Sequence, residues 1–260
     1  CPRSMASSAP CSRRSWPALQ HGHQVASGDL LANNRIQTLI DVSAWYSMSH
    51  QAADRKTVMQ VAIITGAGSG IGLATARMLH DTGMAVVGIG RDPAKLKALE
   101  ETIGQPERLV ALSVDITAKD APKLIVDQAL ERFGRIDFLV NNAGIGSPKP
   151  LHETDDDTLD HFLDIMLRAP FRLARDVIPH MQAGSGVVNV TSTFAMIGGK
   201  RGGAYSAAKG GLKSLTEHMA CEYGPLGIRS NCVAPGVTMT DMVRHRFEDE
   251  TFKRVNVETT

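Results

Sequence analysis

Short apolar runs alternate with helical segments along most of the chain, and this alternation constrains the fold more than any other feature of the sequence. The runs have the length and β-branched content of buried strands, and they lie at residues 58–65, 84–90, 107–114, 135–142, 186–192 and 228–234. The segments predicted to be helical lie at residues 71–81, 93–102, 122–133, 155–181 and 204–223. Strands separated by helices pair in parallel through right-handed crossovers. The pattern therefore predicts an α/β fold with a doubly wound parallel sheet, whose ligands lie at the carboxyl ends of the strands.

The start of the chain differs in composition from the rest. Residues 1–57 are rich in Ser, Pro, Ala and Arg at their beginning and show no sustained hydrophobic period. The whole chain has 260 residues, which suffices for one α/β domain. We interpret residues 1–57 as a poorly ordered N-terminal extension and residues 58–260 as a single domain. The chain begins with Cys1, and Met48 lies shortly before the first strand, so one hypothesis is that the extension is not native. A targeting arm is the alternative.

Charge and cysteine usage exclude several classes of function. The formal net charge is +1, so no basic surplus indicates binding to nucleic acid or to an anionic membrane surface. No apolar run approaches the roughly 20 residues that span a bilayer. The four cysteines, Cys1, Cys11, Cys221 and Cys232, show no metal-ligand spacing, so no metal is expected. We expect free thiols in a reducing compartment and a cytoplasmic protein.

A glycine-rich loop, TGAGSGIG at residues 65–72, joins the first predicted strand to the first helix. Gly66 permits a tight turn, Gly70 permits close approach of a phosphate to the backbone, and Gly72 permits close packing of helix and strand. The helix that follows presents unpaired N–H groups to an anion. A glycine loop alone is weak evidence because flexible turns are common, but this one stands between a strand and a helix. The segment therefore predicts a nucleotide site.

The end of the second predicted strand bears on the choice of cofactor. It reads GIGRDP, with Gly90 followed by Arg91 and Asp92. An acidic residue there favours NAD through the ribose 2′-hydroxyl, and an arginine favours NADP through the 2′-phosphate. We predict NADP, because Arg91 offers a guanidinium and Gly90 carries no competing charge; NAD is the alternative. A solvated turn that caps the next helix would also account for Arg91 and Asp92.

A phenol and an amine lie four residues apart in the segment AYSAAKGG. On a helix, Tyr205 and Lys209 share one face, one turn apart. A phenol with a pKa of about 10 is a weak base near neutral pH, and a lowering of ~3 units requires ~4 kcal/mol, which nearby cations in a partly dry cleft can supply. Tyr205 could then exchange a proton with a substrate oxygen, which Ser192, at the end of the fifth strand, would hydrogen-bond. An exposed helical pair is the alternative for an isolated Tyr and Lys at this spacing.

Several motifs in order resemble the short-chain dehydrogenase/reductase family. They are TGAGSGIG (65–72), VDI (114–116), NNAG (141–144), VTST (190–193), YSAAK (205–209) and NCVAPGVTMT (231–240). The resemblance implies that residues 58–260 form an NAD(P)-binding Rossmann-fold oxidoreductase domain, with Ser192, Tyr205 and Lys209 catalytic. The cofactor-binding positions that it implies are Gly66, Ser69, Gly70, Ile71, Gly72, Arg91, Asp115, Ile116, Asn142, Ala143, Gly144, Tyr205, Lys209, Pro235, Gly236 and Thr240.

The chain departs from the family pattern at two places. Many relatives carry an asparagine that holds a proton-relay water in the long helix after the fourth strand, and here DIMLRAPF places Met166 at that position. Methionine sulfur is only a weak acceptor, so the relay is expected to be impaired or replaced. Relatives also continue through further helices and a last strand, whereas this sequence stops at Thr260. The final edge strand is therefore expected to be missing, and the C-terminus to be truncated.

Two functions are consistent with these residues. One is an NADP-dependent oxidoreductase that interconverts a secondary alcohol and a ketone on a small-molecule substrate. The other is a catalytically impaired nucleotide-binding relative that serves as a sensor or partner subunit. Helices at 155–181 and 204–223 form oligomer contacts in relatives, so the resemblance implies a homodimer or homotetramer. Lys200 and Arg201, in MIGGKRGG, suggest an anionic substrate, although a solvated loop is the simpler interpretation.

Overall fold

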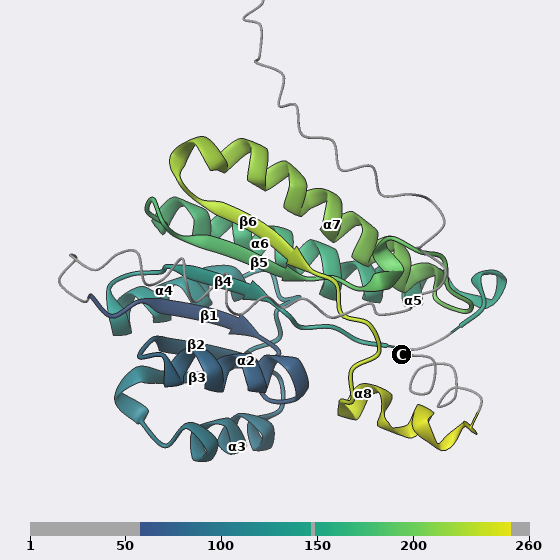
Figure 1. Ribbon diagram of the computed structural model, residues 1–260, viewed down its shortest axis with the longest axis horizontal. Helices are drawn as coiled ribbons and strands as arrows, with labels where there is room; N and C mark the ends of the chain where they lie inside the picture. The colour runs from purple at the N-terminus through teal and green to yellow at the C-terminus, as the bar shows by residue number, and fades with distance from the viewer. Residues whose placement is uncertain (1–57, 147–148, 251–260) are drawn as a thin grey trace, which may run out of the picture. The chain divides into compact units, whose positions relative to one another are not determined.

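A computed structural model describes residues 58–146 and 149–250 of the chain. Its core is a parallel sheet whose strands lie in the order β3-β2-β1-β4-β5-β6 (Figure 1). The strands are β1 Val61–Thr65, β2 Ala85–Gly90, β3 Leu109–Ser113, β4 Phe138–Asn141, β5 Gly186–Val190 and β6 Arg229–Val233. The strand order reverses between β1 and β4, which pair directly. The predicted doubly wound parallel sheet is confirmed, and ligands of such sheets bind at the point of reversal.

Helices cover both faces of the sheet. They are α2 Gly70–Asp81, α3 Pro93–Ile103, α4 Ala121–Phe133, α5 Asp156–Leu163, α6 Ala169–Val177, α7 Gly203–Tyr223 and the short α8 Asp241–Arg244. Apolar residues of α2 and α3 pack against one face of β1 and β2, and residues of α4, α6 and α7 pack against the other face. Alternate residues of β1 therefore lie in different cores: Ala62 and Ile64 in the first, Val61 and Ile63 in the second.

The long helix predicted at residues 155–181 is not continuous. After α5 the chain makes a π-helical turn over Asp164–Arg168, resumes as α6, and ends in a 3-10 turn over Ile178–His180. Pro170 gives the physical reason, because proline has no backbone N–H to donate to the carbonyl four residues earlier, which belongs to Met166. The apolar pattern predicted the helical segment but not the register change inside it.

The predicted strand ends extend beyond the observed ones. The first strand, predicted from residue 58, begins at Val61, because Val58 and Met59 are exposed at the entry to the sheet. The fourth, predicted at 135–142, is limited to Phe138–Asn141. Asp137, just before it, accepts a hydrogen bond from the Val61 N–H at 2.8 Å and is paired with Arg135. Apolar composition therefore located the strands, and polar contacts at their ends set their limits.

Polar contacts lock the carboxyl ends of β1 and β4 together. The backbone N–H groups of Asn142 and Ala143 both donate to the Thr65 hydroxyl at 3.0 Å, and the Asn142 amide donates to the Thr65 carbonyl at 2.9 Å. Below them, the buried Asn141 amide donates to Asn189. The Asn189 amide in turn donates to the Thr216 hydroxyl of α7. These contacts fix the strand ends at which the site lies.

Some predictions concern residues beyond those that the structure describes. The extension at 1–57 and the last residues, 251–260, lie outside the described ranges, so the prediction of a poorly ordered extension stays a prediction. Within residues 58–250, β6 is an edge of the sheet and no further strand pairs with it. No helix among the described residues is long and apolar enough to cross a membrane. The same part of the chain holds no cluster of three or more metal-ligating side chains.

Candidate active site

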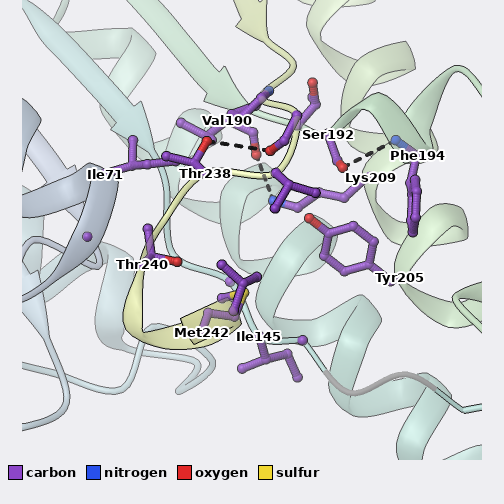
Figure 2. Close-up of a pocket in the computed structure, with 18 of the residues that line it drawn as sticks. Ile71, Ile145, Val190, Ser192, Phe194, Tyr205, Lys209, Thr238, Thr240 and Met242 are labelled. Atoms are coloured by element: carbon purple, nitrogen blue, oxygen red, sulfur yellow. Dashed lines mark hydrogen bonds between the residues drawn. The ribbon is translucent and has the colours of Figure 1, made fainter. Parts of the chain in front are cut away.

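A cavity of about 330 Å³ opens at the carboxyl ends of the central strands (Figure 2). It extends from the glycine loop after β1 to the start of α7, and the segment after β6 closes one side. Most of the residues predicted to form the site line it. They are Gly66, Ser69, Gly70, Ile71, Asn142, Ala143, Gly144, Ser192, Tyr205, Lys209, Pro235, Gly236 and Thr240. The fold therefore brings together motifs that are up to about 170 residues apart in the sequence.

The glycine loop has a conformation that side chains would prevent. Gly66 has φ 68° and Gly70 has φ 53°, in the left-handed region that glycine adopts without strain. Gly72 faces a different constraint, because a Cβ there would lie 2.2 Å from the Gly66 carbonyl oxygen and 2.5 Å from the Asn142 amide nitrogen. Gly72 does not line the cavity itself. It allows α2 to pack closely against the loop and against the end of β4.

The start of α2 fits a phosphate. Ser69 is the N-cap residue with extended backbone, but its side chain makes no capping hydrogen bond. No acidic residue stands in the first turn of the helix, so the N–H groups there have no carboxylate partner within α2. Ser69, Gly70 and Ile71 all line the cavity. Unpaired N–H groups and the positive end of the helix dipole together fit the diphosphate of a dinucleotide.

Arg91, Asp115 and Ile116 do not line the main cavity. Arg91 and Asp115 are exposed at the ends of β2 and β3, near enough that the Arg91 charge contributes to a lowered pKa of the Asp115 carboxyl. The main cause of that lowering is the hydrogen bond from the Thr117 N–H at 2.9 Å. Ile116 is half-buried and packs against the core. These residues therefore lie beside the cavity, at the edge formed by β2 and β3.

A second, open groove runs along the outer side of the glycine loop. Its lining includes Gly68, Ser69, Asp92 and Lys95. Asp92 caps α3 by accepting hydrogen bonds from the backbone of Ala94 and Lys95, so the alternative of a helix cap is correct for this residue. Lys95 was not among the predicted residues. Its position at the third residue after the cap, facing the glycine loop, could have been inferred only from a helix that begins at Pro93.

Ser192 follows β5 and caps a short 3-10 turn, Thr193–Ala195. Its Oγ accepts a hydrogen bond from the Phe194 N–H at 3.2 Å. The Thr193 N–H donates to the Pro235 carbonyl at 3.2 Å, which ties this turn to the segment after β6. The serine hydroxyl is consequently held at the cavity wall, near enough to the Tyr205 phenol to affect its pKa.

Tyr205 lies in the first turn of α7 with its hydroxyl directed into the cavity (Figure 2). Its ring makes edge-to-face contacts with Phe162 and Phe194, at centroid distances of 6.5 and 6.3 Å. Burial raises the pKa of the phenol above its ordinary value of 10.0, and the nearby Ser192 hydroxyl opposes that rise. The protein by itself therefore shifts this pKa in the direction opposite to the predicted lowering. Desolvation of the phenolate by the two aromatic rings explains the difference.

Lys209 is buried one turn after Tyr205, with 4% of its surface exposed. Its Nζ donates to the Val190 carbonyl at 2.6 Å and lies 5.9 Å from the centroid of the tyrosine ring. Burial lowers the pKa of the ammonium to about 8. The alternative of an exposed Tyr-Lys pair is therefore wrong. The Val190 carbonyl was not predicted, because a backbone acceptor leaves no signal in the sequence.

Met166 is fully buried beside this lysine. A Cβ added to Gly144 would lie 3.5 Å from the Met166 sulfur and 3.7 Å from the Lys209 Nζ, so both atoms border the same small space. The position assigned to Met166 by its surrounding sequence is thus near the catalytic candidates. Its side chain offers no strong hydrogen-bonding group there.

The segment after β6 approaches the glycine loop. A Cβ added to Gly70 would lie 3.1 Å from Cγ2 of Thr240, which places Thr240 over the start of α2. Gly236 and Thr240 line the cavity together with Val237 and Met242, and Met242 lies near Ile145 (Figure 2). The apolar residues of this wall, Ile145, Val237 and Met242, were not predicted individually.

Comparisons with known proteins agree with this geometry. The family model described as short chain dehydrogenase matches residues 60–251. The cis-4-hydroxycyclohexanecarboxylate dehydrogenase of Sinomonas cyclohexanicum is 40% identical over 191 residues, which cover 71% of this chain and 75% of that protein. A short-chain dehydrogenase/reductase from Brucella melitensis, titled glucose/ribitol dehydrogenase, has a TM-score of 0.70 at 33% identity and covers 73% of this chain and 77% of its own. The 3-ketoacyl-(acyl-carrier-protein) reductase of the same organism, solved with NADH, has a TM-score of 0.68 at 31% identity, with 71% and 78% covered.

Proposed function

The chain belongs to the short-chain dehydrogenase family of oxidoreductases, and from that premise we propose that it interconverts a secondary alcohol and a ketone. The observation that carries the proposal is the convergence of Ser192, Tyr205 and Lys209 on one cavity that also includes the glycine loop. Proton transfer and nucleotide binding require different groups, and here both sets face the same space.

A nicotinamide dinucleotide, bound with its diphosphate at Ser69, Gly70 and Ile71, would supply the hydride acceptor or donor. Tyr205 exchanges a proton with the substrate oxygen, because its hydroxyl faces the cavity. Ser192 hydrogen-bonds the same oxygen and holds it in place. Below its pKa of about 8, Lys209 carries a positive charge 5.9 Å from the centroid of the phenol ring, which favours the phenolate and opposes the effect of burial. Asn142, Ala143 and Gly144 form the floor of the cavity between these two sets of residues.

We assign NADP as the preferred cofactor, with NAD as the alternative. Arg91 is exposed at the end of β2, Gly90 carries no charge, and Lys95 lines the groove beside the glycine loop. The Asp92 carboxylate, which could repel a 2′-phosphate, accepts hydrogen bonds from the start of α3. A charge-assisted bond to a phosphate contributes roughly 1.5–3 kcal/mol. An Arg91→Ala variant should therefore lose roughly ten- to a hundredfold in kcat/KM with NADPH and little with NADH, and equal losses would contradict the assignment.

An impaired relative is the second candidate, and Met166 is the observation that favours it. Where a relay asparagine is common in the family, this chain has a buried sulfur beside Lys209. A Met166→Asn variant should raise kcat if proton delivery to Lys209 limits turnover. A wild-type protein that binds NADPH without turnover on any substrate, together with an equally inactive variant, would favour a sensor or partner subunit.

A panel of substrates tests the activity directly. The panel contains cis-4-hydroxycyclohexanecarboxylate, glucose, ribitol and a 3-ketoacyl thioester, which are compounds in the names of similar proteins. It also contains the uncharged carboxamide of the first compound as a control for charge. The readout is absorbance of the reduced nicotinamide at 340 nm, with both NADP and NAD. Turnover of at least one member supports the proposal. Cofactor binding without turnover on every member contradicts it.

We further infer a homodimer or homotetramer in the cytoplasm that acts on a small molecule and binds neither nucleic acid nor membrane. Support for the oligomer comes from the family and from the exposed Phe171 of α6, an apolar side chain on a helix surface. Light scattering of the purified chain measures the oligomeric state, and a monomer at micromolar concentration would contradict this inference.

A further inference from the structure

Two positive side chains lie in the wall of the cavity, on the segment that joins the 3-10 turn after Ser192 to α7. Lys200 and Arg201 both line the cavity that holds Ser192 and Tyr205. Both are exposed, and among the described residues neither side chain has an ion pair or a side-chain hydrogen bond. Sequence alone made a solvated loop the simpler interpretation. The structure instead places both side chains in the cavity wall.

Contacts through Phe194 place this loop on the tyrosine side of the cavity. A Cβ added to Gly199 would lie 2.6 Å from the Phe194 ring, and one added to Gly202 would lie 3.5 Å from it. The same ring makes its edge contact with Tyr205. Arg201 precedes Tyr205 by four residues, so their Cα atoms are at most roughly 14 Å apart. The two cations are thus within reach of a substrate whose oxygen is at Tyr205.

The backbone at Arg201 is held in an unfavourable conformation. Arg201 has φ 59°, and it is the one non-glycine residue with positive φ in the described part of the chain. Its carbonyl accepts a hydrogen bond from the Lys149 N–H at 2.9 Å, and Lys149 also forms an isolated bridge with Gly202. A left-handed conformation costs free energy for any residue with a Cβ, and such residues concentrate at functional sites. The strand-like contact from Lys149 therefore fixes an arginine where glycine would fit more easily.

Neighbouring charges leave Lys200 and Arg201 available for a ligand. The Lys149 ammonium pairs with Asp155 at 2.7 Å, so it is engaged elsewhere. Asp241 is the acidic residue of the described cavity wall, and it lies 3.5 Å from Arg244 of its own helix. The cavity therefore has an excess of positive charge on its tyrosine side, and an anion bound there would meet no unpaired carboxylate.

Apolar side chains form another part of the cavity wall. Ile145, Phe194, Val237 and Met242 line the same cavity, and Val237 and Met242 are each 45% exposed. Exposed apolar side chains in the wall of a cavity can bind the hydrocarbon part of a ligand. Ile145 and Met242 lie across the drawn cavity from Ser192 (Figure 2). A ligand that fits this wall has an apolar body and an anionic end.

We propose that the substrate is a hydroxy or keto carboxylate in which an apolar ring or chain separates the reacting carbon from the carboxylate, and that Lys200 and Arg201 bind this carboxylate. The inference rests on the proposed function, because it places the reacting oxygen at Tyr205. Arg201 can form two parallel hydrogen bonds to a carboxylate, and Lys200 adds a second charge. The apolar wall holds the ring or chain between the two ends.

The carboxylate and carboxamide members of the substrate panel test this inference, because they differ in charge and little in shape. We expect kcat/KM to be at least tenfold higher for the carboxylate. In Arg201→Gln and Lys200→Gln variants, the ratio of the two kcat/KM values should fall about tenfold. Arg77→Gln is the matched control, since Arg77 lies on α2 outside both cavities and pairs with Asp81. Its ratio should equal that of the wild type.

Each outcome has a distinct meaning. Equal turnover of the carboxylate and the carboxamide by the wild type would overturn the carboxylate site and leave the proposed oxidoreductase intact. An increase in the KM for NADPH in the Arg201→Gln variant, with no change in the substrate ratio, would assign these cations to the cofactor and also overturn it. No turnover of any panel member would count against the proposed function itself. An Arg201→Gly variant adds a control for folding, because glycine relieves the backbone strain while it removes the guanidinium. It should unfold at or above the wild-type temperature and still lose the preference for the carboxylate.

Discussion

Replacing Lys209 with methionine removes the charge that is proposed to tune Tyr205. The Lys209 Nζ lies 5.9 Å from the centroid of the phenol ring. At an effective dielectric constant of about 20, a unit charge at that distance stabilises the phenolate by about 3 kcal/mol, which corresponds to about 2 pKa units. Methionine has a similar length and suits a buried position, so the variant should keep the fold. We therefore expect the pKa of Tyr205 to rise by about 2 units in Lys209→Met.

The assay is the pH dependence of kcat/KM for alcohol oxidation between pH 5.5 and 10.5. The acid limb of the profile reports the ionisation of the group that accepts the proton, and it should move to higher pH by about 2 units in the variant. Lys213→Met is the matched control, because Lys213 lies one turn further along α7 and pairs with Glu217. Its profile should coincide with that of the wild type.

A shift of less than half a unit in Lys209→Met would refute the electrostatic reasoning. If the variant turns over too slowly for a profile, the ultraviolet absorbance of the phenolate in the cofactor-bound protein gives the same pKa, with Tyr205→Phe as the blank. A phenol that ionises at the same pH with and without Lys209 would mean that this lysine positions the cofactor but does not tune the tyrosine.

Three further predictions concern stability and cofactor binding. Gly72→Ala places a Cβ 2.2 Å from the Gly66 carbonyl oxygen, which would displace the glycine loop that is proposed to bind the diphosphate. The NADPH affinity measured by fluorescence should therefore fall at least tenfold, and an unchanged affinity would contradict diphosphate binding by this loop. Asn189→Ala leaves the buried Asn141 amide without its acceptor and removes the hydrogen bond to Thr216 of α7. The free energy of unfolding, measured by urea titration, should therefore decrease by about 3–5 kcal/mol. A loss below about 1 kcal/mol would contradict a stabilising role for these hydrogen bonds. The pKa of Lys209 is about 8 in the folded chain and 10.5 when unperturbed, so the unfolded state binds more protons between these two pH values. The free energy of unfolding should therefore rise with pH through this window, by up to about 3 kcal/mol relative to Lys209→Met. Parallel plots of unfolding free energy against pH for the two proteins would contradict a buried ammonium.

Sequence patterns predicted the fold because strands and helices of a doubly wound sheet differ strongly in apolar period. The six strands and their parallel pairing follow from that alternation, and the glycine loop is located by Gly66, Gly70 and Gly72 at the first strand–helix junction. The π-helical turn at Asp164–Arg168 could not be predicted in the same way, because the apolar period continues through it. Pro170 signalled a disturbance but not its form.

The site residues were predicted where side-chain identity carries the chemistry, and missed where backbone or position does. Tyr205 and Lys209 are recognisable by type and spacing. The Val190 carbonyl, which accepts a hydrogen bond from Lys209, and the Thr65 hydroxyl, which binds the end of β4, have no spacing rule that reveals them. The direction of the Tyr205 pKa shift also required the structure, because burial between aromatic rings depends on Phe162, about forty residues away in the sequence.

Tyr205 is proposed to carry the proton, and a comparison of two single-residue variants tests this role. Tyr205→Phe removes the hydroxyl and keeps the ring contacts with Phe162 and Phe194. Tyr223→Phe is the control, because Tyr223 lies at the other end of α7 and packs against the core outside the cavity. With the most active substrate of the panel, kcat/KM should fall by about 10²–10⁴-fold in Tyr205→Phe while NADPH affinity stays within threefold, and Tyr223→Phe should match the wild type. A Tyr205→Phe variant that keeps more than a tenth of the wild-type kcat/KM would show that another group carries the proton.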